Sequence, residues 1–110
     1  MAHPSLLTIG TVTCLATDDL LGRDELVGQL GADRFSIGRF NAGDTIEAAV
    51  SRPIASGVDT LVISEADLTG DNELIRVDLT QGMDRDRVVG ILTGRARYDL
   101  SLRVASESDG

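Results

Sequence analysis

Carboxylate and hydroxyl side chains follow the apolar runs of this sequence at intervals that could place them in one site. The residues after successive runs are Asp18 and Asp19, then Ser64 and Glu65, and then Thr93. The carboxyl ends of parallel strands meet at one edge of an open α/β sheet, where such sheets bind ligands. Oxygen ligands of this kind hold divalent cations such as Mg²⁺. The pattern predicts a ligand site at these residues, with Asp18 and Asp19 as metal ligands. The simpler alternative is that they are ordinary loop and cap residues.

The run Asp59–Glu65 is the expected centre of the sheet that would position this site. It follows an amphipathic segment that ends at Gly57, as a parallel strand does when it enters the middle of an α/β sheet. Alternating or continuous apolar patterns predict further strands at residues 6–16, 34–40, 87–93 and 98–104. The last two would form an antiparallel hairpin, with residues 98–104 as an edge strand that could pair across a dimer.

Two helices are expected between these strands. Leucines and Val27 give residues 19–31 one apolar face, which Gly31 would close. Asp44 and Glu47 form a capping-box pattern ahead of a second helix that would end at Gly57. Residues 65–86 fit either a strand or a short helix. The sequence therefore predicts one α/β domain over residues 1–110, of the mainly parallel flavodoxin or receiver type, with frayed ends at 1–5 and 105–110.

The composition of the 110-residue chain limits its partners and its location. Apolar residues make up 42% of the chain and the net charge is −8, with arginine as the only basic residue besides His3. Such an acidic chain is a poor match for nucleic acid or an anionic membrane, and it is typical of a salt-adapted, halophilic or high-GC source. A single cysteine, Cys14, lies in an apolar run, which predicts a buried thiol in a cytoplasmic protein.

The order and spacing of these residues resemble a response-regulator receiver domain over most of residues 6–94. Asp18 and Asp19 would match the acidic pair of that family, Ser64 its phosphoacceptor and Thr93 its conserved hydroxyl. Serine cannot form the acyl phosphate, and the family's lysine has no counterpart because the chain contains no lysine. The resemblance therefore implies a pseudo-receiver that signals through a protein partner without phosphotransfer.

A second resemblance, ranked below the first, is to a cystathionine-β-synthase-type (CBS) regulatory repeat. It rests on residues 44–50, 56–62 and 89–95, and it implies adenine-nucleotide binding with Thr93 near the ribose. Ala96 stands where that family has an aspartate, and no second repeat is visible in residues 1–42.

The sequence thus favours a non-catalytic regulatory domain that acts through a partner protein or a homodimer. A nucleotide-sensing module and a structural assembly subunit are the alternatives. No enzyme is expected, because nothing in the sequence supplies a tuned base beside a nucleophile. No cofactor is expected beyond Mg²⁺ at the acidic pair, and neither nucleic acid nor a membrane is an expected partner.

Overall fold

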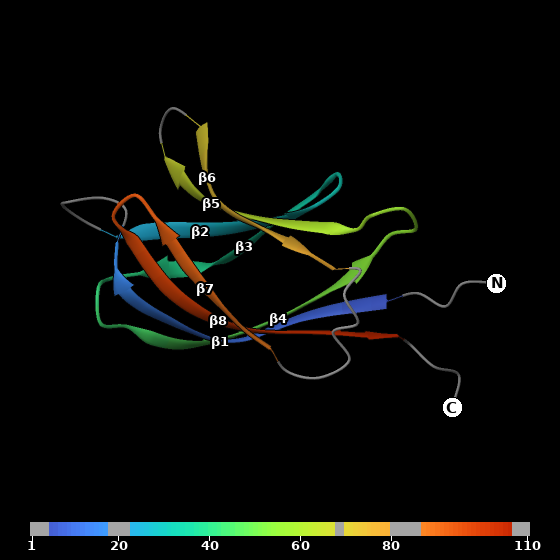
Figure 1. Ribbon diagram of the computed structural model, residues 1–110, viewed down its shortest axis with the longest axis horizontal. Helices are drawn as coiled ribbons and strands as arrows, with labels where there is room; N and C mark the ends of the chain where they lie inside the picture. Colours follow the sequence, from blue (N-terminus) through green and yellow to red (C-terminus); the bar gives the residue numbers. More distant parts are fainter. Residues whose placement is uncertain (1–4, 18–22, 68–69, 80–86, 107–110) are drawn as a thin grey trace.

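The protein is a sandwich of two antiparallel β-sheets in the computed structural model, which describes residues 5–17, 23–67, 70–79 and 87–106 (Figure 1). No helix occurs among these residues. The eight strands are β1 (Ser5–Ala16), β2 (Asp24–Leu30), β3 (Asp33–Phe40), β4 (Thr45–Ile54), β5 (Thr60–Asp67), β6 (Gly70–Asp78), β7 (Arg87–Thr93) and β8 (Ala96–Ser106).

The strands divide into two sheets of four. Sheet A has the order β4-β1-β8-β7, and sheet B has the order β3-β2-β5-β6. Figure 1 shows the two sheets as layers that face each other. Every pairing is antiparallel, so alternate residues of each strand point into the space between the sheets. That space holds the core.

The core is aliphatic, with a small aromatic group at one end. The core cluster includes Leu7, Ile9 and Val12 of β1 and Leu61 and Ile63 of β5, and none of these five side chains has exposed surface. The rings of Phe40 and Tyr98 meet edge to face, with centroids 5.8 Å apart. Burial of these apolar surfaces is the main force that holds the sheets together.

The predicted α/β class is wrong, and so is the flavodoxin or receiver-like parallel sheet. The predicted helix at residues 19–31 is strand β2 over its described part, residues 24–30. Asp24 and Gly28 occupy inward-facing positions of β2, where a strand pattern normally has large apolar residues. The other two inward-facing residues of β2, Leu26 and Leu30, are apolar, and Val27 lies between them. The spacing of these three apolar residues also suits a helix.

The predicted helix from Asp44 to Gly57 is strand β4. Residues 48 and 49 are both alanine, so the segment fits two spacings. Ala49 falls at helical spacing from the other apolar residues, and Ala48 falls at the alternating spacing of a strand. In the structure Ala48, Val50 and Ile54 pack against the core, which is a period of two. The Asp44 carboxylate caps the tight turn before β4, where it accepts a hydrogen bond of 2.8 Å from the backbone N–H of Asn41.

Strands at the other predicted positions are confirmed, as is the antiparallel hairpin of β7 and β8. The segment left open between strand and helix is strand β6. The expected central strand is β5, which lies inside sheet B but between antiparallel neighbours. Residues 98–104 are not an edge strand, because β8 lies between β1 and β7. That placement rules out the dimer contact expected through this segment.

Candidate functional site

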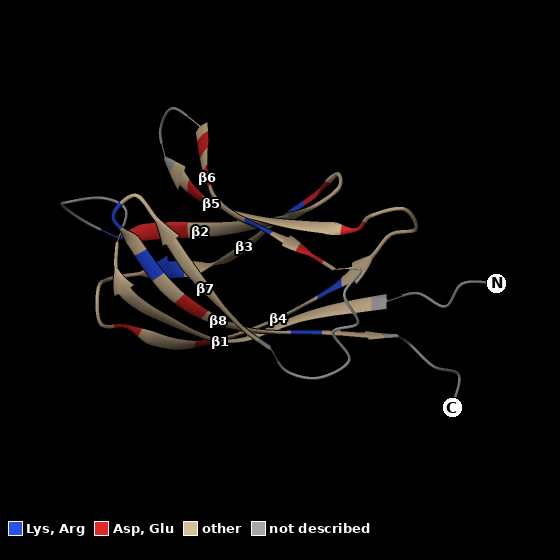
Figure 2. Cartoon of the chain, viewed as in Figure 1, with Lys and Arg blue, Asp and Glu red and all other residues tan. Residues whose placement is uncertain are grey.

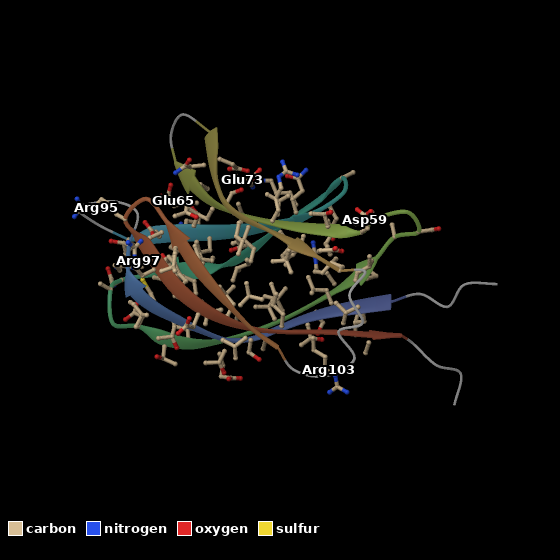
Figure 3. The ribbon with its side chains drawn as sticks, in the orientation of Figure 1. Asp59, Glu65, Glu73, Arg95, Arg97 and Arg103 are labelled. Atoms are coloured by element: carbon tan, nitrogen blue, oxygen red, sulfur yellow. The ribbon has the colours of Figure 1, made fainter. Side chains whose placement is uncertain are left out.

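An open groove of about 540 Å³ lies on the outer face of sheet B. The strands β2, β5 and β6 supply its floor through Gln29, Val62, Ser64 and Glu73, and the β4–β5 connection supplies one wall through Val58 and Asp59. Antiparallel pairing places Ser64 directly opposite Glu73 and Val62 opposite Arg76. The groove is therefore built from the outward-facing residues of three adjacent strands. Figure 3 shows Asp59 and Glu73 on this outer side of the sheet.

The groove carries more negative than positive charge. Asp59, Asp71 and Glu73 line it, and Arg76 is the one arginine in its lining. Arg34, from β3, donates two hydrogen bonds of 2.8 and 2.9 Å to Asp71, and this guanidinium holds the pKa of that carboxyl below its usual range. Exposed ion pairs of this kind exchange readily with other charged partners.

Two of these carboxylates differ in how firmly they are held. Arg76 contacts Glu73 within the same strand, with a nitrogen–oxygen distance of 2.8 Å and both side chains about half exposed. Asp59 accepts a hydrogen bond of 3.0 Å from the Thr60 hydroxyl and has no arginine partner among the described residues. Asp59 is thus the carboxylate best placed to receive a cationic group from outside.

The predicted site residues do not converge in the structure. Ser64 lines the groove, but Glu65 points to the opposite face of β5, where only 2% of it is exposed. Thr93 lies in the other sheet, and its hydroxyl donates a hydrogen bond of 2.5 Å to the Leu74 carbonyl of β6. Neighbouring antiparallel strands end at opposite ends of a sheet, so strand ends cannot gather at one edge as they do in a parallel sheet.

The metal prediction at Asp18 and Asp19 lies outside the described residues. In the part of the chain that the structure describes, no group of three or more histidine, cysteine or acidic side chains is placed to hold a metal ion. Likewise, no helix of the described residues is long and apolar enough to cross a membrane.

A second polar group, formed by Cys14, Asp24 and Tyr98, is enclosed between the sheets. The Tyr98 hydroxyl donates a hydrogen bond of 2.5 Å to the Asp24 carboxylate. Burial, together with this bond to a carboxylate, raises the pKa of Tyr98 far above its usual range, and burial raises the pKa of the Cys14 thiol. All three side chains are at most 1% exposed, so a substrate has no access to them. The predicted burial of Cys14 is confirmed.

Sequence reasoning missed both the groove and Asp24. A signal for the groove exists in β6, where Asp71 and Glu73 alternate with Asn72 and Leu74 at strand spacing. No comparable signal marks Asp24 as buried, because an isolated acidic residue in a sequence normally indicates a surface position.

Comparison with known proteins gives matches at the level of structure only. No family model and no curated protein sequence matches the chain. Among solved structures, the C2A domain of a plant extended synaptotagmin 1 superimposes with a TM-score of 0.57 and 9% identity, over 98% of each chain. A C2 domain-containing protein from a putative elicitor-responsive gene gives a TM-score of 0.54 and 14% identity, over 99% of this chain and 95% of that one.

The fold is that of a C2 domain. The C2A and C2B domains of extended synaptotagmin 2 also match, with a TM-score of 0.53 and 13% identity, over 94% of this chain and 41% of that two-domain chain. The resemblances to a receiver domain and to a CBS repeat are therefore wrong, and with them the pseudo-receiver and nucleotide-sensing functions. The prediction that this chain is not an enzyme stays a prediction, because these matches show the fold alone.

Proposed function

We propose that this C2-type sandwich is a non-catalytic protein-interaction module that binds a basic peptide segment of a partner protein in the groove of sheet B. The observation that carries this proposal is the surplus of carboxylates along the groove, with Asp59 open to an incoming cation. A partner arginine can bind Asp59 directly and can also compete with Arg76 for Glu73, since that pair is exposed.

The charge of the chain supports a basic peptide over other ligands. With a net charge of −8, the chain repels the phosphates of nucleic acid and of anionic lipid at long range, and it attracts cationic segments. The floor of the groove also offers Val62 and Ser64, which suit the aliphatic stem and backbone of an extended peptide. We also propose a cytoplasmic location, which is supported by the one cysteine of the chain being a free thiol.

The test is a binding titration with fluorescent peptides of equal length that carry arginine, neutral or glutamate residues. We expect the arginine peptides to bind most tightly and the affinity to fall as salt is raised. The Asp59→Asn/Glu73→Gln variant should weaken binding by about tenfold, because each lost charge contact contributes about 0.5–1 kcal/mol at an exposed site. The matched control is Asp99→Asn, which removes a charge from the exposed outer face of sheet A.

Three results would contradict the proposal. Arginine and glutamate peptides could bind equally, the control could weaken binding as much as the groove variant, or no peptide could bind. The last result would indicate that the acidic surface serves solvation in high salt.

A further inference from the structure

Apart from Arg87 at its start, the edge strand β7 lacks the features that protect the other sheet edges. Over the residues that the structure describes, the sandwich has four edge strands: β4 and β7 in sheet A, and β3 and β6 in sheet B. Charges, proline or bulges that discourage pairing with another strand occur in three of them, namely Pro53 in β4, Arg34 and Arg39 in β3, and Asp71, Glu73 and Arg76 in β6. In β7, residues 88–93 contain no charge and no proline (Figure 2).

The outer face of β7 is apolar and exposed. Val88 and Leu92 are 70% and 78% exposed, the highest values among the exposed large hydrophobic side chains of the described residues. Gly90, midway between them, is exposed as well. Isolated surface aliphatics are ordinary, but two that flank a glycine on one unprotected edge strand form a continuous surface for a neighbouring strand.

The backbone of β7 is ready to pair at these same positions. The β7–β8 hairpin closes at Thr93 and Ala96 around a two-residue turn. Such a turn closes on a hydrogen-bonded pair, and hydrogen-bonded positions alternate along an antiparallel ladder. Residues 93, 91 and 89 therefore direct their backbone groups to β8, and residues 92, 90 and 88 direct theirs to the open edge.

We propose that β7 pairs in antiparallel fashion with β7 of a second copy of this chain, centred on Gly90. In this register Gly90 lies opposite Gly90, and Val88 of each copy lies opposite Leu92 of the other. All the outward backbone groups are used, and the four exposed aliphatic side chains meet on one face. The two copies of sheet A then form one continuous eight-stranded sheet, four strands from each copy.

A second copy is the partner because the strand is complementary to itself. A two-fold axis through Gly90 exchanges Val88 with Leu92, so one surface supplies both halves of the contact. The strand of an unrelated protein would need to match both the register and the aliphatic pair. The contact lies on sheet A, so it does not depend on the groove of sheet B or on what that groove binds.

The first test measures mass by sedimentation equilibrium at tens of micromolar protein. We expect twice the monomer mass of 11.6 kDa for the unchanged chain. Val88→Lys/Leu92→Lys places like charges opposite each other and should give a monomer, whereas Val88→Lys/Leu92→Glu places opposite charges together and should restore the dimer. The control is Leu15→Lys, at a residue that is 60% exposed but lies in β1, and it should remain dimeric.

The second test fixes the register with cysteines. Hydrogen-bonded antiparallel partners lie about 5.5 Å apart at Cα, within the span of a disulfide. Gly90→Cys should therefore cross-link to itself under mild oxidation, and a mixture of the Val88→Cys and Leu92→Cys chains should link to each other. Asp99→Cys, which lies opposite Gly90 on β8, should not link. Two β7 strands would lie between the two cysteines at position 99 and hold them about 14 Å apart.

The outcomes decide the proposal without reference to peptide binding. A monomeric unchanged chain, a dimer that survives the double lysine change, or equal cross-linking at residues 90 and 99 would each overturn it. Melting curves of each variant show whether a loss of dimer reflects unfolding of the sandwich.

Discussion

The Tyr98 hydroxyl and the Asp24 carboxylate form a hydrogen bond of 2.5 Å that joins the two sheets of the sandwich. Tyr98 belongs to β8 in sheet A, and Asp24 begins β2 in sheet B. Both side chains are buried, and the Phe40 ring packs edge-on against Tyr98. A polar contact of this kind constrains how one sheet lies over the other, because shifting either sheet would leave a buried carboxylate poorly solvated.

Tyr98→Phe should lower the free energy of unfolding by about 1–3 kcal/mol, because the ring is kept but the donor to a buried carboxylate is lost. Urea unfolding measures this loss as a shift of the midpoint with an unchanged slope. Thr13→Val is the control, since it removes a hydroxyl that contacts Thr45 at 3.3 Å at an exposed site. An equal loss of stability from the two changes would show that the hydrogen bond to Asp24 contributes no more than an exposed hydroxyl contact.

Raising the pH above about 10 should destabilise the protein through the same tyrosine. The folded state raises the pKa of Tyr98, so above its usual value the unfolded chain releases this proton and the folded chain keeps it. The stability is therefore complete below about pH 10 and falls above it, by up to about 1.4 kcal/mol per pH unit for each such group. The buried Cys14 thiol, whose pKa is also raised, contributes a further loss of stability that begins lower, above about pH 9.

This pH dependence can be read directly, because Tyr98 is the one tyrosine and the chain has no tryptophan. The ultraviolet absorbance of tyrosinate should appear together with unfolding. Tyr98→Phe should have a flatter stability profile in the alkaline range. Ionisation of Tyr98 near its usual pKa in a chain that is still folded would contradict the assigned environment.

The strands that alternate cleanly could be predicted from sequence, and those with an inward polar residue or glycine could not. Residues 98–104 alternate along their length, and residues 34–40 alternate at Phe35 and Ile37 before Gly38 interrupts the period; the strands predicted at both segments are confirmed. In β2, Asp24 and Gly28 hide the period of two, because the first is buried through a partner 74 residues away and the second is covered by Phe35. Both are tertiary facts that no local pattern records.

The candidate site could likewise be predicted from the sequence only where its signal is local. Ser64 was found because it follows an apolar run, and it does line the groove. The expectation that Thr93 lies beside Ser64 assumes a parallel sheet, whereas Thr93 belongs to the other sheet. The acidic side chains of the groove come from the β4–β5 connection, which supplies Asp59, and from β6, whose pairing with β5 places Glu73 opposite Ser64.

Gly28→Ala should lower the free energy of unfolding by about 1–3 kcal/mol, because it overfills a packed position. A Cβ atom at residue 28 would lie 2.5 Å from Cζ of Phe35, which is the residue directly opposite in β3. The ring has little room to move, since the Arg52 guanidinium lies 5.1 Å from its centroid. Thermal unfolding of the variant gives the loss.

A smaller side chain at residue 35 provides the matched test. Phe35→Leu in the Gly28→Ala background should restore part of the stability, so the two changes should not be additive. Gly10→Ala is the control, because the nearest atom to its added Cβ would be the Ser101 hydroxyl at 3.6 Å. Strict additivity of the changes at 28 and 35 would contradict the proposed clash.

Ala49→Gly should raise the free energy of unfolding by about 0.5–1 kcal/mol. Ala49 is the one non-glycine residue with positive φ, at 50°, among those described, and it lies where the β1–β4 register shifts. This left-handed conformation costs a residue with a Cβ about 1–2 kcal/mol, and glycine avoids that cost while adding about 0.4–1 kcal/mol of unfolded-state entropy. Ala55→Gly, at an exposed residue without positive φ, incurs only the entropic loss. The two variants should therefore shift the urea midpoint in opposite directions, and a shift in the same direction would show that Ala49 is not strained.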